Sequence, residues 1–282
     1  MSTSEPYYWK ASDGIEMYGH KWGVDEPRAV VILVHGMNEH CLRFDHVAKE
    51  FNQSGFTVYG FDHRGHGRTK GKRGHTPSYD KLLESVKDTI DRAKAENNAK
   101  PIFLYGHSMG GNVVLNYALQ RKPDKDTIAG IMSSSAWLAL PSGPPAILNF
   151  LAKFLRCIWP SFTQKSTLDP EAMSRDPEVI KKYKSDSLVH DRISVEFFLG
   201  CREAADFALA NAGDFGYPLW IAHGTEDKLT SHDASKEFSG KVPNAAWKSW
   251  EGFYHELHNE PEKKQVIDSM IDFMNSLLEE NA

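Results

Sequence analysis

Several features that mark secreted, membrane-spanning and metal-binding proteins are scarce in this sequence of 282 residues. It has only three cysteines, Cys41, Cys157 and Cys201, which are scattered and lack the spacing of a zinc site. Its first residues contain no apolar run of the kind found in a signal peptide, and no stretch approaches the ~20 apolar residues that span a bilayer. We therefore expect free thiols in a reducing compartment and a soluble, cytoplasmic protein.

An excess of positive charge is also lacking. The chain has 38 acidic against 33 basic residues, a formal net charge of −5. Nucleic-acid-binding proteins usually present a basic face, so we expect no nucleic-acid partner. The hydrophobic content of 40% is ordinary for a globular protein. The length fits one large α/β domain, residues 1–282, with an insertion.

Short apolar runs alternate with helical patterns along most of the chain. The continuous run Ala29–Val34 is typical of a strand that is buried on both faces. Further strands are expected at 56–59, 102–105, 127–132, 218–222 and 245–250, and helices at 79–97 and 262–278. This alternation predicts an α/β fold with a mostly parallel, twisted sheet flanked by helices.

One region interrupts the alternation. Residues 141–212 have a helical pattern with prolines and no convincing strand. A helix expected at 146–159 has only Asn149, Lys153 and Arg156 on its polar stripe, so it offers more apolar surface than packing on one core requires. A second helix is expected around 193–209. The pattern predicts a helical lid, inserted between two strands and covering a site.

A nucleophile motif lies between a strand and a helix. The segment Gly106-His-Ser-Met-Gly110 follows the strand at 102–105 and precedes a helical run, which is the setting of the G-x-S-x-G elbow. The serine of such an elbow sits on a strained turn, so the residues two positions away must be small. The serines 133–135 also end a strand but lack flanking glycines. Ser108 is therefore the predicted nucleophile.

A serine hydroxyl needs a histidine to accept its proton and a carboxylate to orient that histidine. In this arrangement the acid follows the serine in the chain and the histidine comes last. Asp227, after the strand at 218–222, is the predicted acid, and the adjacent Glu226 is expected to point elsewhere. His255, in the loop after the last strand, is the predicted base, with His258 as its rival. His223, before a glycine, is expected to shape a turn.

Acyl transfer also needs two backbone N–H donors for the developing oxyanion. We predict the N–H of Met109, directly after the nucleophile, and the N–H of Met37, in the loop 35–40 after the first central strand. The histidines of Asp62-His63-Arg-Gly-His66 have no third and fourth metal ligand at usable spacing. We expect neither a metal nor a cofactor.

Taken together, these segments resemble the monoacylglycerol lipase and lysophospholipase-like family of serine hydrolases with the α/β-hydrolase fold. The likeness covers about residues 10–275 and rests on the segments 35–40, 61–67, 106–111, 174–175, 183–186 and 252–258. It implies hydrolysis of a monoacylglycerol, or a related single-chain acyl ester, to fatty acid and alcohol without a cofactor. It also implies peripheral contact with a lipid interface through an apolar lid. Mammalian monoacylglycerol lipases carry a cysteine shortly after the acid, which Asp227-Lys-Leu-Thr230 lacks.

Other activities remain open, because the same three residues serve every acyl leaving group. A lysophospholipase, carboxylesterase, thioesterase or aminopeptidase would need the same set. An alternative of a different class is a non-catalytic ligand receptor on this fold, against which the complete set of serine, acid and histidine argues. Epoxide hydrolases and dehalogenases use an aspartate at the elbow, so Ser108 excludes them.

Overall fold

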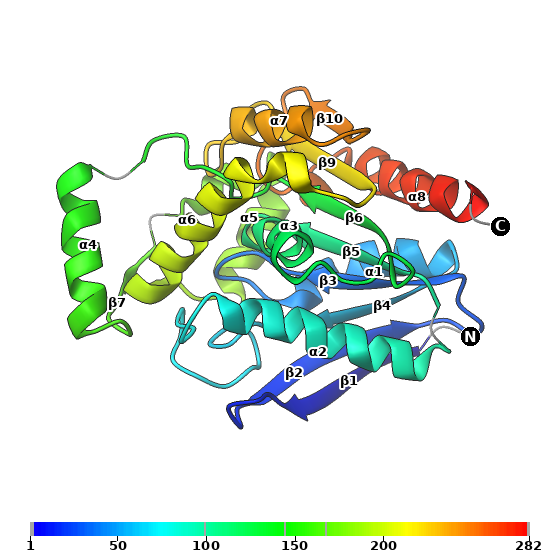
Figure 1. The fold of residues 1–282 in the computed structure, drawn as a ribbon, viewed down its shortest axis with the longest axis horizontal. Coiled ribbons are helices and arrows are strands. Elements are labelled where there is room, and N and C mark those ends of the chain that lie inside the picture. Colours follow the sequence, from blue (N-terminus) through cyan, green and yellow to red (C-terminus); the bar gives the residue numbers. More distant parts are fainter. Residues whose placement is uncertain (1–2, 99, 144, 167, 281–282) are drawn as a thin grey trace.

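A sheet of eight strands forms the centre of the computed structural model, which describes residues 3–98, 100–143, 145–166 and 168–280 (Figure 1). Along the sheet the strands follow the order β1-β2-β4-β3-β5-β6-β9-β10. Their bounds are β1 Thr3–Lys10, β2 Glu16–Gly23, β3 Ala29–Val34, β4 Phe56–Phe61, β5 Ile102–His107, β6 Ile128–Ser134, β9 Leu219–Gly224 and β10 Ala246–Trp250. β2 pairs antiparallel with β1 and β4, and the other neighbouring pairs are parallel. The predicted mostly parallel sheet is confirmed.

Helices cover both faces of this sheet, which is why its central strand β3 is buried and apolar throughout. Successive residues of β3 point to opposite faces. Val30 and Ile32 join a core with α2 (Asp80–Glu96), α3 (Met109–Arg121) and α7 (His232–Lys241). Val31 and Leu33 join a second core with α1 (Asp45–Gln53) and α8 (Lys263–Glu280). The predicted helices at 79–97 and 262–278 correspond to α2 and α8.

Between β6 and β9 the chain leaves the sheet. This region contains α4 (Ala146–Ile158), α5 (Pro177–Ser185) and α6 (Val195–Ala210), and α4 lies beside α6 at the edge of the molecule (Figure 1). It also contains β7 (Thr163–Lys165) and β8 (Arg192–Ser194), which pair antiparallel in a separate small sheet. The expectation that this region has no strand was wrong, because strands of three residues are too short to show an alternating pattern.

The parallel strands end level with one another, so the loops that follow them meet. Val34 of β3 is opposite Gly106 of β5, His107 of β5 is opposite Ser134 of β6, and Gly224 of β9 is opposite Trp250 of β10. The segments with the predicted site residues follow four of these strands directly. The sheet therefore gathers at one edge residues that are up to about 220 positions apart in sequence.

Short 3-10 helices complete the chain: η1 Cys41–Phe44, η2 Pro170–Ala172, η3 Ala212–Asp214 and η4 Leu257–Asn259. Within the part of the chain that the structure describes, no helix is long and apolar enough to cross a membrane.

Gly110 makes the close contact between α3 and β3 possible, because a Cβ atom at this position would overlap the carbonyl oxygen of Val34. We expect Gly110→Ala to lower the free energy of unfolding by about 1–3 kcal/mol, the usual cost of overpacking. The control is Gly240→Ala on the exposed side of α7, where no described atom lies within 4 Å of the added methyl group. This change should be stabilising by about 0.4–1 kcal/mol. Urea unfolding of both variants checks this, and equal stability of Gly110→Ala and wild type would contradict it.

Candidate active site

Ser108 occupies a strained turn between β5 and α3. Its backbone angles are φ 57° and ψ −117°, a region that residues other than glycine rarely adopt. Gly106 and Gly110 allow the turn, since a Cβ atom on either would overlap backbone atoms, of Gly110 and Val34 respectively. Conformations of this kind cost about 1–3 kcal/mol and cluster at functional sites. The motif seen in the sequence thus has its strand–turn–helix setting, with Ser108 at the apex.

Asp227 and His255 meet in the interior, next to this turn. Nδ1 of His255 lies 2.7 Å from Oδ2 of Asp227, and both side chains are buried. The other oxygen, Oδ1, accepts the N–H groups of Leu229 and Thr230 at 2.7 and 3.0 Å. Burial would raise the pKa of Asp227, but His255 and His223 outweigh it and hold that pKa well below its usual value. Burial would lower the pKa of His255, but Asp227 raises it overall.

The alternative acid and base lie elsewhere. The side chain of Glu226 is exposed. His258 is buried with its ring stacked on Phe44 at 4.3 Å between centroids, and burial holds its pKa well below the usual value. The structure therefore brings His255, and not His258, to the predicted acid.

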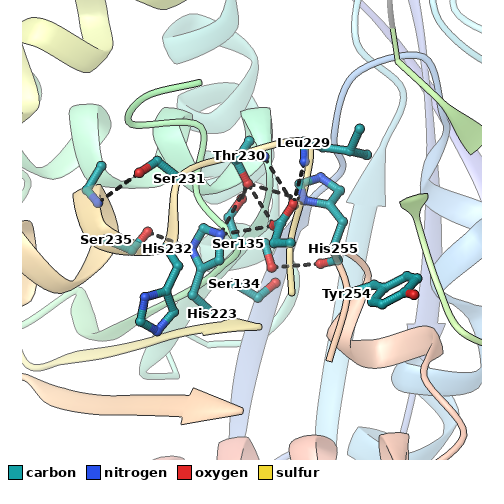
Figure 2. A network of polar contacts seen from close by, with 12 residues as sticks. Ser134, Ser135, His223, Leu229, Thr230, Ser231, His232, Ser235, Tyr254 and His255 are labelled. Carbon is teal, nitrogen blue, oxygen red and sulfur yellow. Dashed lines mark hydrogen bonds and ion pairs between the residues drawn. The ribbon is translucent and has the colours of Figure 1, made fainter. Parts of the chain in front are cut away.

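A second histidine also contacts Asp227. Nε2 of His223 lies 2.9 Å from Oδ2 of Asp227, and Figure 2 shows His223 and His255 approaching the same point from opposite sides. The sequence predicted only a role in the turn for His223. Its position four residues before the acid was the one signal that could have indicated this contact.

Thr230 and Ser135 connect the loop of Asp227, the loop of His255 and the loop after β6 (Figure 2). Oγ1 of Thr230 lies 2.9 Å from Oδ2 of Asp227 and 3.0 Å from the carbonyl oxygen of Ser135. Ser135 in turn donates its hydroxyl to the carbonyl oxygen of His255 at 2.6 Å. Sequence reasoning discarded Ser135 as a nucleophile and missed Thr230. Both connect the loop after β6 to the acid and the histidine.

The two predicted oxyanion donors, Met109 and Met37, belong to two different segments, which follow β5 and β3. Met109 is the first residue of α3, so its N–H has no partner within the helix. Met37 follows Gly36 in the loop after β3 and lines the same cavity as Ser108.

A buried ionic network fixes this loop. The N–H of Gly36 donates to Oε1 of Glu39 at 2.7 Å, and Arg43 contacts Oε2 of Glu39 at 2.6 Å. Arg43 also forms two hydrogen bonds, of 2.7 and 2.8 Å, with Glu256, the residue after His255. Burial raises the pKa of Glu39. It would also raise that of Glu256, but Arg43 outweighs burial there and lowers that pKa. The network joins the loop of Met37 to the loop of His255, which no local sequence pattern indicated.

Ser108 and His255 line one cavity of about 390 Å³, a volume within the range of small-molecule sites. Apolar side chains form much of its wall, namely Met37, Trp137, Leu140, Pro141, Leu168, Ile193, Phe198 and Leu229. Its polar wall includes Ser142, Gln164, Lys165, Ser166, Lys228 and Thr230. The arrangement suits a molecule with an apolar chain and a polar end. Among the residues the structure describes, no group of three or more His, Cys, Asp or Glu side chains could hold a metal ion.

Comparison with known proteins gives consistent matches. The family model described as "Serine aminopeptidase, S33" matches residues 25–262. The chain is 33% identical over 281 residues to the monoacylglycerol lipase of Mycolicibacterium smegmatis, covering 98% of this chain and 99% of that protein. It is 32% identical over 249 residues to phospholipase YtpA of Bacillus subtilis, covering 87% and 95%. It also spans 27% of a longer, uncharacterized abhydrolase domain-containing protein of Dictyostelium discoideum, with 34% identity.

A solved structure supports the same grouping. The crystal structure of Paleococcus ferrophilus monoacylglycerol lipase matches with a TM-score of 0.85 and 33% identity, covering 93% of this chain and 99% of that one. The resemblance seen in the sequence and the predicted α/β-hydrolase fold are both confirmed.

Among the residues that the structure describes, Arg43 is the only cation that pairs with Glu39 and Glu256, so its loss would leave two buried carboxylates near each other. We expect Arg43→Met to lower the free energy of unfolding by about 3–5 kcal/mol, the usual cost of breaking a buried ionic network. Lys49→Met is the matched control, because Lys49 pairs with Asp45 on the exposed surface of α1 and should contribute less than about 1 kcal/mol. Urea unfolding checks both values. Similar stability of the two variants would contradict the role given to the network.

Proposed function

Because the chain belongs to the monoacylglycerol lipase-like family of α/β-fold serine hydrolases, we propose that it hydrolyses carboxylic esters with Ser108 as nucleophile, His255 as base and Asp227 as acid. One observation carries this proposal. A serine on a strained turn shares a cavity wall with a histidine whose Nδ1 is held by a buried aspartate.

The proposed reaction proceeds through an acyl-enzyme. Nε2 of His255 accepts the hydroxyl proton of Ser108 as the oxygen attacks the acyl carbonyl carbon, and Asp227 stabilises the resulting imidazolium. The N–H groups of Met37 and Met109 donate to the oxyanion, each contributing about 3 kcal/mol. His255 then protonates the departing alcohol. A water molecule, activated by the same histidine, releases the fatty acid and restores Ser108.

We propose a monoacylglycerol as the substrate. The apolar part of the cavity wall suits a single acyl chain, while the wall's hydroxyl, amide and ammonium groups suit the glycerol end. The similarity over nearly the whole chain to proteins named as monoacylglycerol lipases supports the same substrate. A lysophospholipase remains the second candidate, because a relative of similar identity is named as a phospholipase.

The helix α4 supports contact with a lipid interface, because it presents its apolar side to solvent. Ile147, Phe150 and Ile158 are 64%, 66% and 66% exposed, and Leu148, Leu151, Phe154 and Trp159 are exposed as well. Soluble proteins rarely leave so large an apolar patch uncovered without a partner for it.

Two residues of the polar stripe of α4, Asn149 and Arg156, face the protein, while the third, Lys153, is exposed. Arg156 forms two hydrogen bonds with Glu196 and two with Glu203, both on α6, at 2.7–2.9 Å. Asn149 accepts a hydrogen bond from Arg202, which is also on α6. The lid helix is thus fixed through its polar side, and we propose that its apolar side rests on the lipid that holds the substrate.

The activity is tested with a panel of esters and a fluorophosphonate probe. We expect the probe to label Ser108 and Ser108→Ala to lower kcat by about 10³-fold or more, because only binding and oxyanion stabilisation remain. The panel comprises 1-monooleoylglycerol, a lysophospholipid, p-nitrophenyl butyrate, an acyl thioester and an aminoacyl amide. The monoacylglycerol should give the highest kcat/KM. A label on another serine would contradict the assignment of the nucleophile, and a higher kcat/KM for the thioester or amide would contradict the substrate.

The lid is tested by placing charge on its exposed face. We expect Ile147→Glu combined with Leu151→Glu to weaken binding to phospholipid vesicles at least about tenfold, because two apolar side chains no longer enter the interface. Hydrolysis of long-chain monoacylglycerol should slow, while cleavage of soluble p-nitrophenyl butyrate persists. Tyr8→Glu, an exposed aromatic on β1 that is 56% accessible, is the matched control and should change neither. Loss of both activities together with thermal stability would mean that these residues stabilise the fold instead.

A further inference from the structure

The carboxylate of Asp227 is shared by two imidazoles, and only one of them is used by the proposed reaction. Oδ2 lies 2.7 Å from Nδ1 of His255 and 2.9 Å from Nε2 of His223. The side chain of His223 is completely buried, and that of His255 is 4% exposed. We propose that His223 is a positioning residue of the triad, which holds Asp227 in place and limits how strongly its charge acts on His255.

The surroundings of His223 determine which of its nitrogens carries a proton. A carboxylate only accepts hydrogen bonds, so Nε2 must be the protonated nitrogen that donates to Asp227. Nδ1 lies 2.8 Å from the hydroxyl of Ser235 on α7. Burial lowers the pKa of His223 despite the neighbouring Asp227, which favours the neutral ring, and in that form Nδ1 accepts from Ser235. The hydroxyl of Ser235 then donates to Nδ1 and holds the ring with Nε2 towards Asp227.

This donor has two effects on the triad. It stabilises the ionised form of Asp227 and fixes the direction of Oδ2, which His255 needs for its own hydrogen bond. It also weakens the electrostatic interaction between Oδ2 and His255, because Oδ2 accepts a second hydrogen bond. Without it, the carboxylate would interact more strongly with the imidazolium form of His255, and the pKa of His255 would rise.

Other groups also act on His255, and substitution of His223 removes none of them. Glu256 and Glu39 act on its charge, and the ring of His107 lies 4.8 Å away between centroids. Thr230 remains near Oδ2, but its single hydroxyl proton is also within reach of the carbonyl oxygen of Ser135. A change in the titration of His255 on substitution of His223 would therefore report the lost donor.

The inference rests on the proposed function, since it assigns His223 a task in the same triad. The test compares His223→Leu, which removes the donor at similar volume, with His223→Gln, whose amide N–H can replace it. The readouts are kcat and KM for p-nitrophenyl butyrate as functions of pH.

The Leu variant should lose about tenfold in kcat with KM nearly unchanged. The acid limb of kcat/KM should move to higher pH by about half a unit to one unit, because His255 stays protonated, and inactive, to higher pH. The Gln variant should recover the position of the limb and most of kcat.

Ser235→Ala is the second variant, and it decides the case if His223→Leu fails to fold. It leaves the imidazole in place but removes the hydrogen bond to Nδ1 that orients the ring, so the limb should move in the same direction by a smaller amount. Equal losses in the Leu and Gln variants with an unmoved acid limb would show that His223 only fills space. An unmoved limb in Ser235→Ala would likewise contradict the orienting role given to Ser235.

Titration of the histidines by NMR separates this inference from the proposed function. If the wild type hydrolyses no ester of the panel, the proposed function fails, yet the pKa of His255 in wild type and His223→Leu can still be compared. A higher pKa of His255 in the Leu variant supports the inference independently of turnover. An unchanged pKa contradicts it even in an active enzyme.

Discussion

The arrangement of the site depends on one buried charge. Asp227 lies in the interior, where an ionised carboxylate is stable only if hydrogen-bond donors surround it. These donors come from its own loop, from β9 through His223 and from the loop after β10 through His255. Satisfying the carboxylate therefore fixes the distance between two loops that are 28 residues apart. The orientation of His255 is a consequence of this requirement.

A second buried charge network fixes the loop that follows β3. Arg43 connects Glu39, which holds the loop after β3, to Glu256, which follows His255. The strained turn at Ser108 lies between these two anchored loops. Strain of about 1–3 kcal/mol at one residue persists only where the surrounding structure determines its conformation. Here the close contact of Gly110 in α3 with β3, together with the two charge networks, holds the backbone of Ser108 in its strained conformation.

The sequence predicted those parts of the molecule that local pattern encodes. β3 and β5 are continuous apolar runs, and the Ser108 elbow has a fixed spacing of glycines, so both were found. β1 was not, because it is an exposed edge strand that contains Pro6 and is defined only by pairing with β2. The contact of Arg43 with Glu256 joins residues 213 positions apart, so no window of sequence could indicate it. His223 was visible in the sequence, but its second partner was not.

Helix α4 shows most clearly what a pattern leaves undetermined. A helix with a narrow polar stripe is amphipathic whichever way it faces, and the usual expectation is that its apolar side packs inward. In this chain Glu196 and Glu203, on α6, offer carboxylates to Arg156, and the side of α4 that carries Asn149 and Arg156 is the side that packs. The apolar side of α4, on the other face of the helix, is therefore exposed to solvent. Because β7, which follows α4 closely, contributes Gln164 and Lys165 to the cavity wall, this outward surface is connected by a short segment to the cavity of Ser108. Two ion-paired glutamates on a neighbouring helix thus decide which face of α4 is exposed.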